Sequence, residues 1–153
     1  MDWTIERDDP RRDDVVALLE AHLTLMYEIT PADHVHALDL DGLCVPEISF
    51  FSCRREGVLL AVGALKRIDD GHAELKSMHT AVSARGSGIG AAMVEHLVAE
   101  ARAGGICRLS LETGSQEAFG PARRLYARFG FEECGPFGDY DAAAESAFMT
   151  RVL

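Results

Sequence analysis

The spacing of apolar residues changes several times along the chain, and each change predicts a different element. Residues 3–7 alternate in character, which is typical of a short strand. After an Asp-Asp-Pro turn, apolar side chains recur every three or four residues from Val15 to Met26, which predicts an amphipathic helix. A second, shorter helical piece is predicted from Pro31, and residues 38–47 are expected to form a loop.

Three apolar runs separated by tight polar turns follow. Residues 48–53, 58–66 and 73–82 are predicted strands, and the segments 54–57 and 69–72 between them are predicted turns. Turns this short join antiparallel neighbours, so the three strands are expected to form a meander.

Helices and strands alternate in the second half of the chain. In order, we predict a helix over 88–103, a strand over 106–112, a helix over 117–128, a strand from 131, a loop over 135–140 and a strand over 146–153. Because a helix connects them, the strands 73–82 and 106–112 are expected to be parallel. The order βααβββαβαββ predicts a single α+β domain over residues 1–153, built on one mixed sheet.

Composition and charge narrow the range of partners. The chain has 153 residues, of which 48% are hydrophobic and 26% charged, and its formal net charge is −10. Nucleic-acid binding needs clustered lysine and arginine to replace phosphate counterions, and the chain has no basic stripe, so we do not expect it. No apolar run approaches the roughly 20 residues that span a bilayer, so no membrane association is expected.

The cysteines and the first residues indicate a compartment. The four cysteines are dispersed, without a C-x-x-C pair, and are expected to be reduced thiols. The chain begins with neither a basic n-region nor an apolar h-region, so no signal peptide is expected. We therefore predict a cytoplasmic protein.

A glycine-rich turn, Arg85-Gly-Ser-Gly-Ile-Gly-Ala91, joins a predicted strand to a predicted helix. Backbone N–H groups at the positive end of a helix dipole can bind an anionic ligand. The phosphate loop of nucleotide hydrolases is excluded, because no Lys-Ser or Lys-Thr follows the glycines. A dinucleotide site stays an alternative, because the turn fits G-x-G-x-x-A and Glu112 ends the next strand, where a ribose-binding acid would lie. The antiparallel meander before the turn is not typical of such a site. A turn without a ligand is a further alternative.

With Arg85 at its edge, the turn resembles the R/Q-x-x-G-x-G/A acetyl-CoA signature of the GNAT N-acetyltransferase superfamily. Residues 125–131, Leu-Tyr-Ala-Arg-Phe-Gly-Phe, are similar to that superfamily's C-terminal LYxxxGF element. The resemblance covers essentially the whole chain and is closest to small, single-domain bacterial members. It implies the GNAT fold, a mixed and mostly antiparallel sheet flanked by helices.

The resemblance implies acetyl-CoA as cosubstrate, without a metal. The pyrophosphate would lie on the backbone N–H groups of the turn, and the pantetheine arm would lie along the preceding strand. The residues implied in these contacts are Met78, His79, Thr80, Arg85, Gly86, Ser87, Gly88, Ile89, Gly90 and Ala91. Ser115, which follows the strand ending at Glu112, is implied as a further contact with the pantetheine.

The resemblance also implies catalytic residues. Tyr126 matches a tyrosine that acts as general acid near the cofactor sulfur, although its place on an apolar helix stripe also fits a core residue. Glu74 is the candidate base, but Lys76 is expected to face the same side and to lower the pKa of that carboxylate. A backbone N–H near Met78 is expected to hold the oxyanion.

Three further groups of residues have expected roles. Phe50, Phe51 and Tyr140 are candidates for the lining of the acceptor pocket. Residues 33–39 include Asp33, His34, His36 and Asp39 but lack the spacing of a zinc site, so a surface role without a metal is expected. The arginines within 123–128 are expected mainly to form a solvated helix face, and contact with the terminal phosphate of the cofactor is the alternative.

These observations predict an N-acetyltransferase that moves acetyl from acetyl-CoA to a primary amine of a small molecule or peptide. Direct attack in a ternary complex is expected, because no cysteine is paired with a base in the sequence. The alternative is a non-catalytic sensor or regulatory module that binds acetyl-CoA. A homodimer is compatible with the resemblance.

Overall fold

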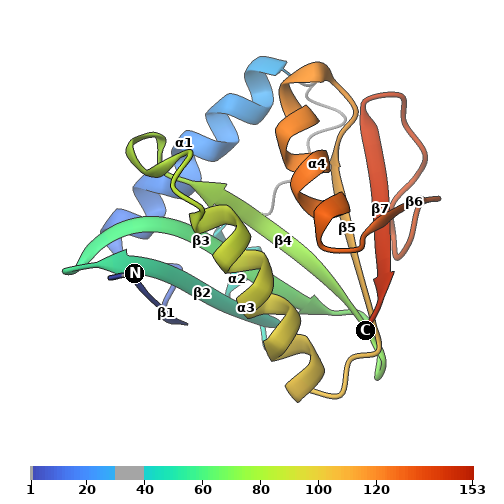
Figure 1. Ribbon diagram of the computed structural model, residues 1–153, viewed down its shortest axis with the longest axis horizontal. Coiled ribbons are helices and arrows are strands. Elements are labelled where there is room, and N and C mark those ends of the chain that lie inside the picture. The colour runs from blue at the N-terminus through green and yellow to red at the C-terminus, as the bar shows by residue number, and fades with distance from the viewer. Residues whose placement is uncertain (1, 30–39) are drawn as a thin grey trace.

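A computed structural model describes residues 2–29 and 40–153 of the chain. The elements are β1 (Thr4–Arg7), α1 (Asp13–Ile29), α2 (Leu40–Leu43), β2 (Ile48–Arg55), β3 (Val58–Arg67), β4 (His72–Thr80), α3 (Ile89–Ala103), β5 (Arg108–Gly114), α4 (Gly120–Arg128), β6 (Glu132–Cys134) and β7 (Ser146–Val152). The seven strands form one sheet in the order β1-β2-β3-β4-β5-β7-β6. Figure 1 shows this sheet behind α3 and α4.

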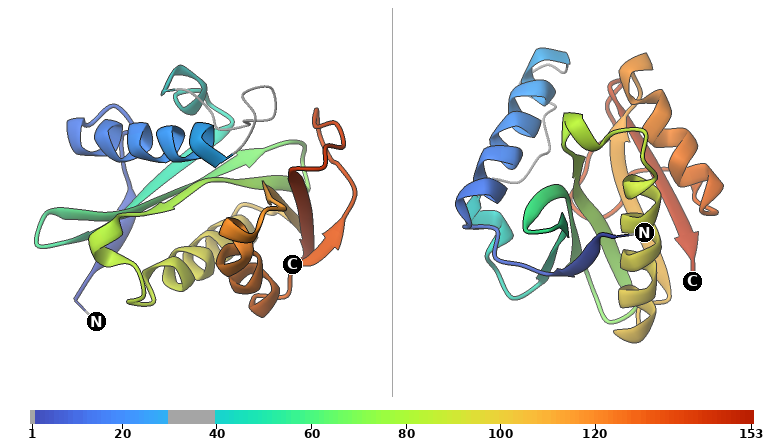
Figure 2. Two further views of the ribbon diagram at one scale, coloured as in Figure 1. Left: turned by 90° about the horizontal axis from the view of Figure 1, so that it is seen from above. Right: turned by 60° about the vertical axis from the view of Figure 1, so that its left-hand side comes forward.

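The sheet is antiparallel except at its centre. β4 and β5 pair in parallel, and the helix α3 makes the connection between them. As Figure 2 shows, α1 and α2 cover one face of the sheet, and α3 and α4 cover the other. The α+β class, the mixed sheet, the meander β2-β3-β4 and the parallel β4–β5 pair confirm the predictions from the sequence.

The structure corrects the predictions in two connecting segments. The expected loop over 38–47 contains the short helix α2, which buries Leu43. The strand predicted over 73–82 ends at Thr80, and a short 3-10 turn, Val82–Ala84, follows it. The helical piece predicted from Pro31 lies outside the described residues.

Side chains along each strand point alternately to the two faces of the sheet, so each face has its own apolar core. On the α3 side, Leu75, Met93 and Leu97 belong to a large buried cluster. On the α1 side, Val15 and Val62 belong to a smaller one. Burying both faces stabilises the sheet by roughly 25 cal/mol for each Å² of apolar surface removed from water.

A β-bulge in β4 changes the direction of its side chains. Val62 pairs with His79 and Ala64 pairs with Lys76, so two residues of β4 lie opposite the single Gly63. Ser77 takes up the extra residue with a φ of 55°, in the left-handed region. The bulge leaves Met78 packed against the α3 side, where its sulfur would be 2.8 Å from a Cβ at position 63.

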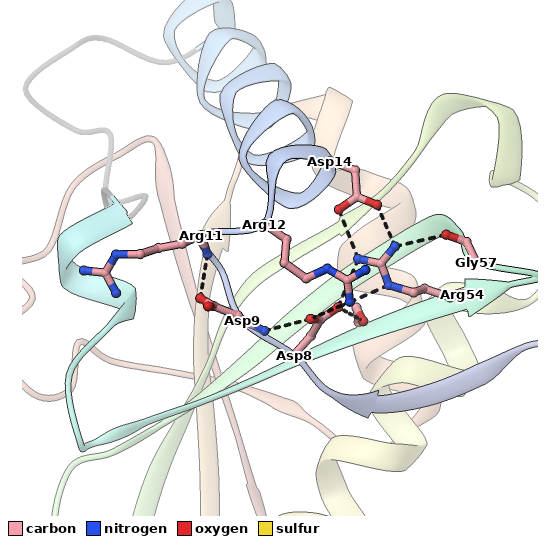
Figure 3. Close-up of polar contacts among 8 residues, drawn as sticks. Asp8, Asp9, Arg11, Arg12, Asp14, Arg54 and Gly57 are labelled. Atoms are coloured by element: carbon pink, nitrogen blue, oxygen red, sulfur yellow. Dashed lines mark hydrogen bonds and ion pairs between the residues drawn. The ribbon is translucent and has the colours of Figure 1, made fainter.

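An ionic network fastens the start of α1 to the sheet (Figure 3). The Arg54 guanidinium donates to both carboxylate oxygens of Asp14, at 2.6 and 3.0 Å, and to Oδ2 of Asp8 at 3.0 and 3.2 Å. The Ser52 hydroxyl also donates to Asp8, at 2.5 Å. Burial alone raises the pKa of Asp8, but the hydrogen bonds from Ser52 and Arg54 outweigh burial and leave that pKa below its ordinary value.

Candidate functional site

The two parallel strands at the centre of the sheet separate to form a cleft. β4 and β5 pair from His72 and Arg108 only as far as Leu75 and Leu111. Beyond that point β4 continues to Thr80 and β5 to Gly114, and the strands diverge, as Figure 1 shows. A cavity of about 120 Å³ lies at this divergence, between strands of the sheet and helices from both faces.

The divergence leaves one edge of β4 facing the cleft. Met78, His79 and Thr80 come after the last residue of β4 that pairs with β5. His79 and Thr80 are paired with β3 along the opposite edge of the strand. Backbone groups on the cleft edge can therefore pair with an extended ligand that lies there like an added strand.

The glycine turn lies between the end of β4 and the start of α3. Gly86 and Gly88 have φ values of 77° and 85°, which L side chains rarely adopt, and a Cβ at either position would meet nothing within 4 Å. The first helical hydrogen bond runs from the Ala92 N–H to the Gly88 carbonyl at 3.0 Å. The N–H groups ahead of Ala92 consequently have no acceptor within the helix, and Gly88 supplies no side-chain cap. This arrangement can bind an anion.

Several residues hold the turn in shape. The Ser87 hydroxyl donates to the Ala84 carbonyl, and Nε of Arg85 donates to the Thr80 carbonyl at 3.4 Å. Ile89 is buried in the core, which anchors the first turn of α3. Gly90 and Ala91 complete that turn.

Tyr126 of α4 lines the cavity between the strands. Its side chain is 7% exposed and packs edge-on against Phe131, with ring centroids 5.9 Å apart. Burial raises the pKa of Tyr126 to about 12, so the phenol keeps its proton at neutral pH. Within the described part of the chain its hydroxyl has no hydrogen-bond partner. A protonated phenol at the wall of a cavity can donate a proton to a ligand there.

Glu74 is not an isolated carboxylate. It is 4% exposed, and its Oε2 accepts hydrogen bonds from the Lys76 ammonium at 3.0 Å and from the Tyr140 hydroxyl at 2.5 Å. Lys76, 9% exposed, also donates to the Tyr140 oxygen at 2.7 Å. Lys76 faces the same side as Glu74, as the sequence predicts, because the bulge lies after both of them. Burial and the neighbouring Glu74 carboxylate raise the pKa of Tyr140, which therefore acts as a hydrogen-bond donor.

A larger cavity of about 990 Å³ lies beyond this group. Glu74, Lys76 and Tyr140 line both cavities, so the three side chains lie where the cleft meets the larger space. Tyr140 thus lines a cavity, and its place in an acceptor pocket stays a prediction. Phe50 and Phe51, also predicted to line that pocket, are instead buried in the two cores on opposite faces of the sheet, because neighbouring residues of a strand point to opposite sides.

A histidine pair that the sequence did not reveal borders the cleft. Nδ1 of His22, from α1, lies 3.0 Å from Nδ1 of His79, from β4, so one ring donates and the other accepts. Burial lowers the pKa of both, that of His79 to about 4, and leaves the pair neutral at pH 7. His22 lines the cavity, and its membership of the apolar stripe of α1 was the only signal for its inward position.

Ser115 and Arg123 hold the end of β5. The Ser115 hydroxyl donates to the Ala144 carbonyl, and its N–H donates to the Glu145 carbonyl at 2.9 Å. Arg123 was expected to lie on a solvated helix face. Its guanidinium instead donates a hydrogen bond to the Gly114 carbonyl at 2.5 Å. The contact of Ser115 with pantetheine stays a prediction.

Residues 2–29 and 40–153 contain no group of three or more metal-ligating side chains, and Asp33, His34, His36 and Asp39 lie outside these ranges. In the same two ranges, no helix combines the length and the apolar character that crossing a bilayer requires.

Comparisons with known proteins agree with this geometry. Residues 12–131 match the sequence profile of the Acetyltransferase (GNAT) family. The chain is 44% identical over 149 residues to the uncharacterized N-acetyltransferase YsnE of Bacillus subtilis, covering 97% of this chain and 99% of that protein. It is 39% identical over 151 residues to the IAA acetyltransferase of Azospirillum brasilense, covering 98% and 97% of the two chains.

A solved structure has the same architecture. The crystal structure of a candidate acyl-CoA N-acyltransferase from Klebsiella pneumoniae is similar with a TM-score of 0.80 and 26% sequence identity, over 99% of this chain and 97% of that one. The fold predicted from the glycine turn and the order of elements is confirmed.

Proposed function

Because the chain belongs to the acetyltransferase (GNAT) family, we propose that it transfers acetyl from acetyl-CoA to a primary amine, by direct attack in a ternary complex. The observation that carries this proposal is the cleft between β4 and β5. It has an uncapped helix start with two left-handed glycines at one end and the buried phenol of Tyr126 in its wall. An extended ligand with a pyrophosphate and a thioester fits this combination.

The turn from Arg85 to Ala91 would bind the pyrophosphate through backbone N–H groups, with the Arg85 guanidinium adding a positive charge. The backbone of Met78, His79 and Thr80 would pair with the pantetheine along the open edge of β4. An N–H near Met78 would stabilise the oxyanion.

The chemical step needs a neutral amine and a protonated leaving group. The amine nitrogen attacks the carbonyl carbon of the thioester, so that a C–N bond forms and the C–S bond breaks. Tyr126 would give its proton to the departing thiolate, and its raised pKa keeps that proton available at neutral pH. Direct attack is supported because, among the described residues, no cysteine lines either cavity.

Removal of the proton from the amine is assigned to Glu74. Its two hydrogen bonds from Lys76 and Tyr140 both go to Oε2, and the carboxylate borders both cavities. Because Oε2 is already engaged by these two donors, we assign transfer of the amine proton to the carboxylate through a bridging water.

The alternative is a module that binds acetyl-CoA without turnover. The cavity of about 990 Å³ beyond Glu74 favours the enzyme, because a sensor needs no second space next to the thioester. The two relatives are named as acetyltransferases, and we carry over the transfer of acetyl and not the acceptor.

Calorimetry with acetyl-CoA tests the binding site. We expect one molecule to bind each chain, and Gly88→Ala to weaken binding by about tenfold. Alanine disfavours the left-handed conformation by roughly 1–2 kcal/mol, so the free variant leaves the binding conformation of the turn and must recover it to bind. Gly135→Ala is the matched control, since its Cβ would also meet nothing within 4 Å and its φ is not in the left-handed region. Absence of binding to the wild type, or equal affinities for both variants, would contradict the assignment.

A further inference from the structure

The positions of the lysines in the chain indicate the chemical class of the molecule that accepts the acetyl group. The chain contains only two lysines among its 15 basic residues, Lys66 and Lys76. Both line the cavity of about 990 Å³, in a protein whose formal net charge is −10. The two lysines have different surroundings: Lys76 is buried and paired with Glu74, whereas Lys66 is half-buried in the cavity wall.

Lys66 has a free charge next to the reacting end of the cavity. Within the described part of the chain, its ammonium makes no ion pair or hydrogen bond. Lys66 lies directly opposite Glu74 in the antiparallel pair of β3 and β4, so their side chains leave the sheet about 5 Å apart on the same face. A molecule whose amine is next to Glu74 therefore places its neighbouring atoms within reach of Lys66.

The rim of the cavity carries negatively charged side chains, opposite in charge to Lys66. Glu47, Asp139 and Asp141 line it and are exposed. Arg67 also borders the cavity, but its guanidinium donates to the carbonyls of Asp70 and Gly104 and is not available to a ligand. The cavity thus combines an acidic rim with the unpaired ammonium of the half-buried Lys66 in its wall, which disfavours a purely anionic ligand.

We propose that the acceptor is a small zwitterionic amine of the amino-acid type, whose carboxylate pairs with Lys66 while its amine lies at Glu74. This inference rests on the proposed acetyl transfer and specifies its substrate class. The acidic rim draws in the ammonium, Lys66 binds the carboxylate, and a ligand of zero net charge satisfies both. Amino acids with neutral side chains are therefore better acceptors than dicarboxylic ones.

Release of free CoA from acetyl-CoA tests this with matched pairs of acceptors. Each neutral amino acid is compared with its decarboxylated amine, for example phenylalanine with phenethylamine, and polyamines are included. We expect the best amino acid to exceed its decarboxylated partner by at least tenfold in kcat/KM, the range of a hydrogen bond between charged groups. Lys66→Met should abolish that preference, mainly through a higher KM for the amino acid, and Lys66→Arg should restore most of it.

The control is Arg102→Met, which removes an exposed positive charge at the end of α3, outside the cavity. It should leave the preference unchanged. Equal or better turnover of decarboxylated amines or polyamines by the wild type would overturn the inference and leave the proposed function standing. A preference that persists in Lys66→Met would also overturn it. No release of CoA with any amine would instead refute the proposed function itself.

Discussion

At the scale of single residues, burial decides what Tyr126 can do. A phenol in water has a pKa of about 10, and removal from water disfavours the charged phenolate. The pKa of Tyr126 rises to about 12 because the ring is enclosed between α4 and the core. The position on an apolar helix stripe that makes Tyr126 resemble a core residue also buries it, and burial keeps the phenol protonated, as the proposed role of general acid requires.

Tyr126→Phe tests that role. It removes the hydroxyl and keeps the ring, so we expect kcat to fall by about 10²–10⁴-fold with little change in the affinity for acetyl-CoA. Tyr27→Phe is the matched control, because Tyr27 is exposed on α1. An unchanged kcat in Tyr126→Phe would show that another group protonates the thiolate.

Residue spacing predicted some of the site and missed the rest. The shared orientation of Glu74 and Lys76 follows from their separation by two positions in a strand. The hydrogen bond from Tyr140 to Glu74 joins residues 66 positions apart, and the His22–His79 contact joins residues 57 positions apart. No local pattern encodes such contacts, because they depend on how a loop and a helix pack on the sheet.

At the scale of elements, the bulge in β4 determines how that strand meets its neighbours. The register predicted from alternation alone would place Met78 on the α1 side. The extra residue at Ser77 moves it to the α3 side, where it packs beside Met93 over Gly63. The meander was predictable from turn lengths and the parallel β4–β5 pair from the connecting helix, whereas the place of β7 between β5 and β6 was not. The bulge and the helix α2 were not predictable either, because each is short and depends on tertiary contacts.

Gly63→Ala measures how tightly this region packs. The added Cβ would lie 2.8 Å from the Met78 sulfur and 2.9 Å from Cγ of Met93, so these side chains or the strand must shift. We expect the free energy of unfolding to fall by about 1–3 kcal/mol in chemical denaturation. Gly135→Ala, in open space, should change it by less than about 0.5 kcal/mol. Equal stabilities for the two variants would show that Met78 and Met93 adapt freely.

At the scale of the whole molecule, the network around Arg54 couples α1 to the sheet and makes stability depend on pH. The side chains of Arg54 and Asp8 are 14% and 7% exposed. The lowered pKa of Asp8 means that the folded state favours the carboxylate. Its stabilising contribution is complete above the ordinary pKa of about 3.9 and is lost as the pH falls through the lowered value.

Arg54→Met should therefore destabilise the protein most at neutral pH. We expect a loss of about 2–3 kcal/mol in the free energy of unfolding, because Asp8 keeps a buried charge without the two hydrogen bonds that the Arg54 guanidinium donates to it. The deficit should shrink as the pH falls below the ordinary carboxyl pKa of about 3.9 and through the lowered pKa of Asp8, where the wild type also loses this charge. Arg55→Met, which breaks an exposed contact with Asp2, should have little effect at any pH. A deficit that does not vary with pH would mean that lost packing, and not charge, explains it.

The proposed acetyl transfer requires that the cleft between β4 and β5 presents acetyl-CoA to an amine in the adjoining cavity. The rate of CoA release from acetyl-CoA, with and without amines, together with mass spectrometry of the amine, tests this arrangement. We expect slow release without an amine, faster release as the amine concentration rises, and an amount of N-acetylated product equal to the CoA released. Binding of acetyl-CoA with no amine-dependent release across a broad panel would contradict it.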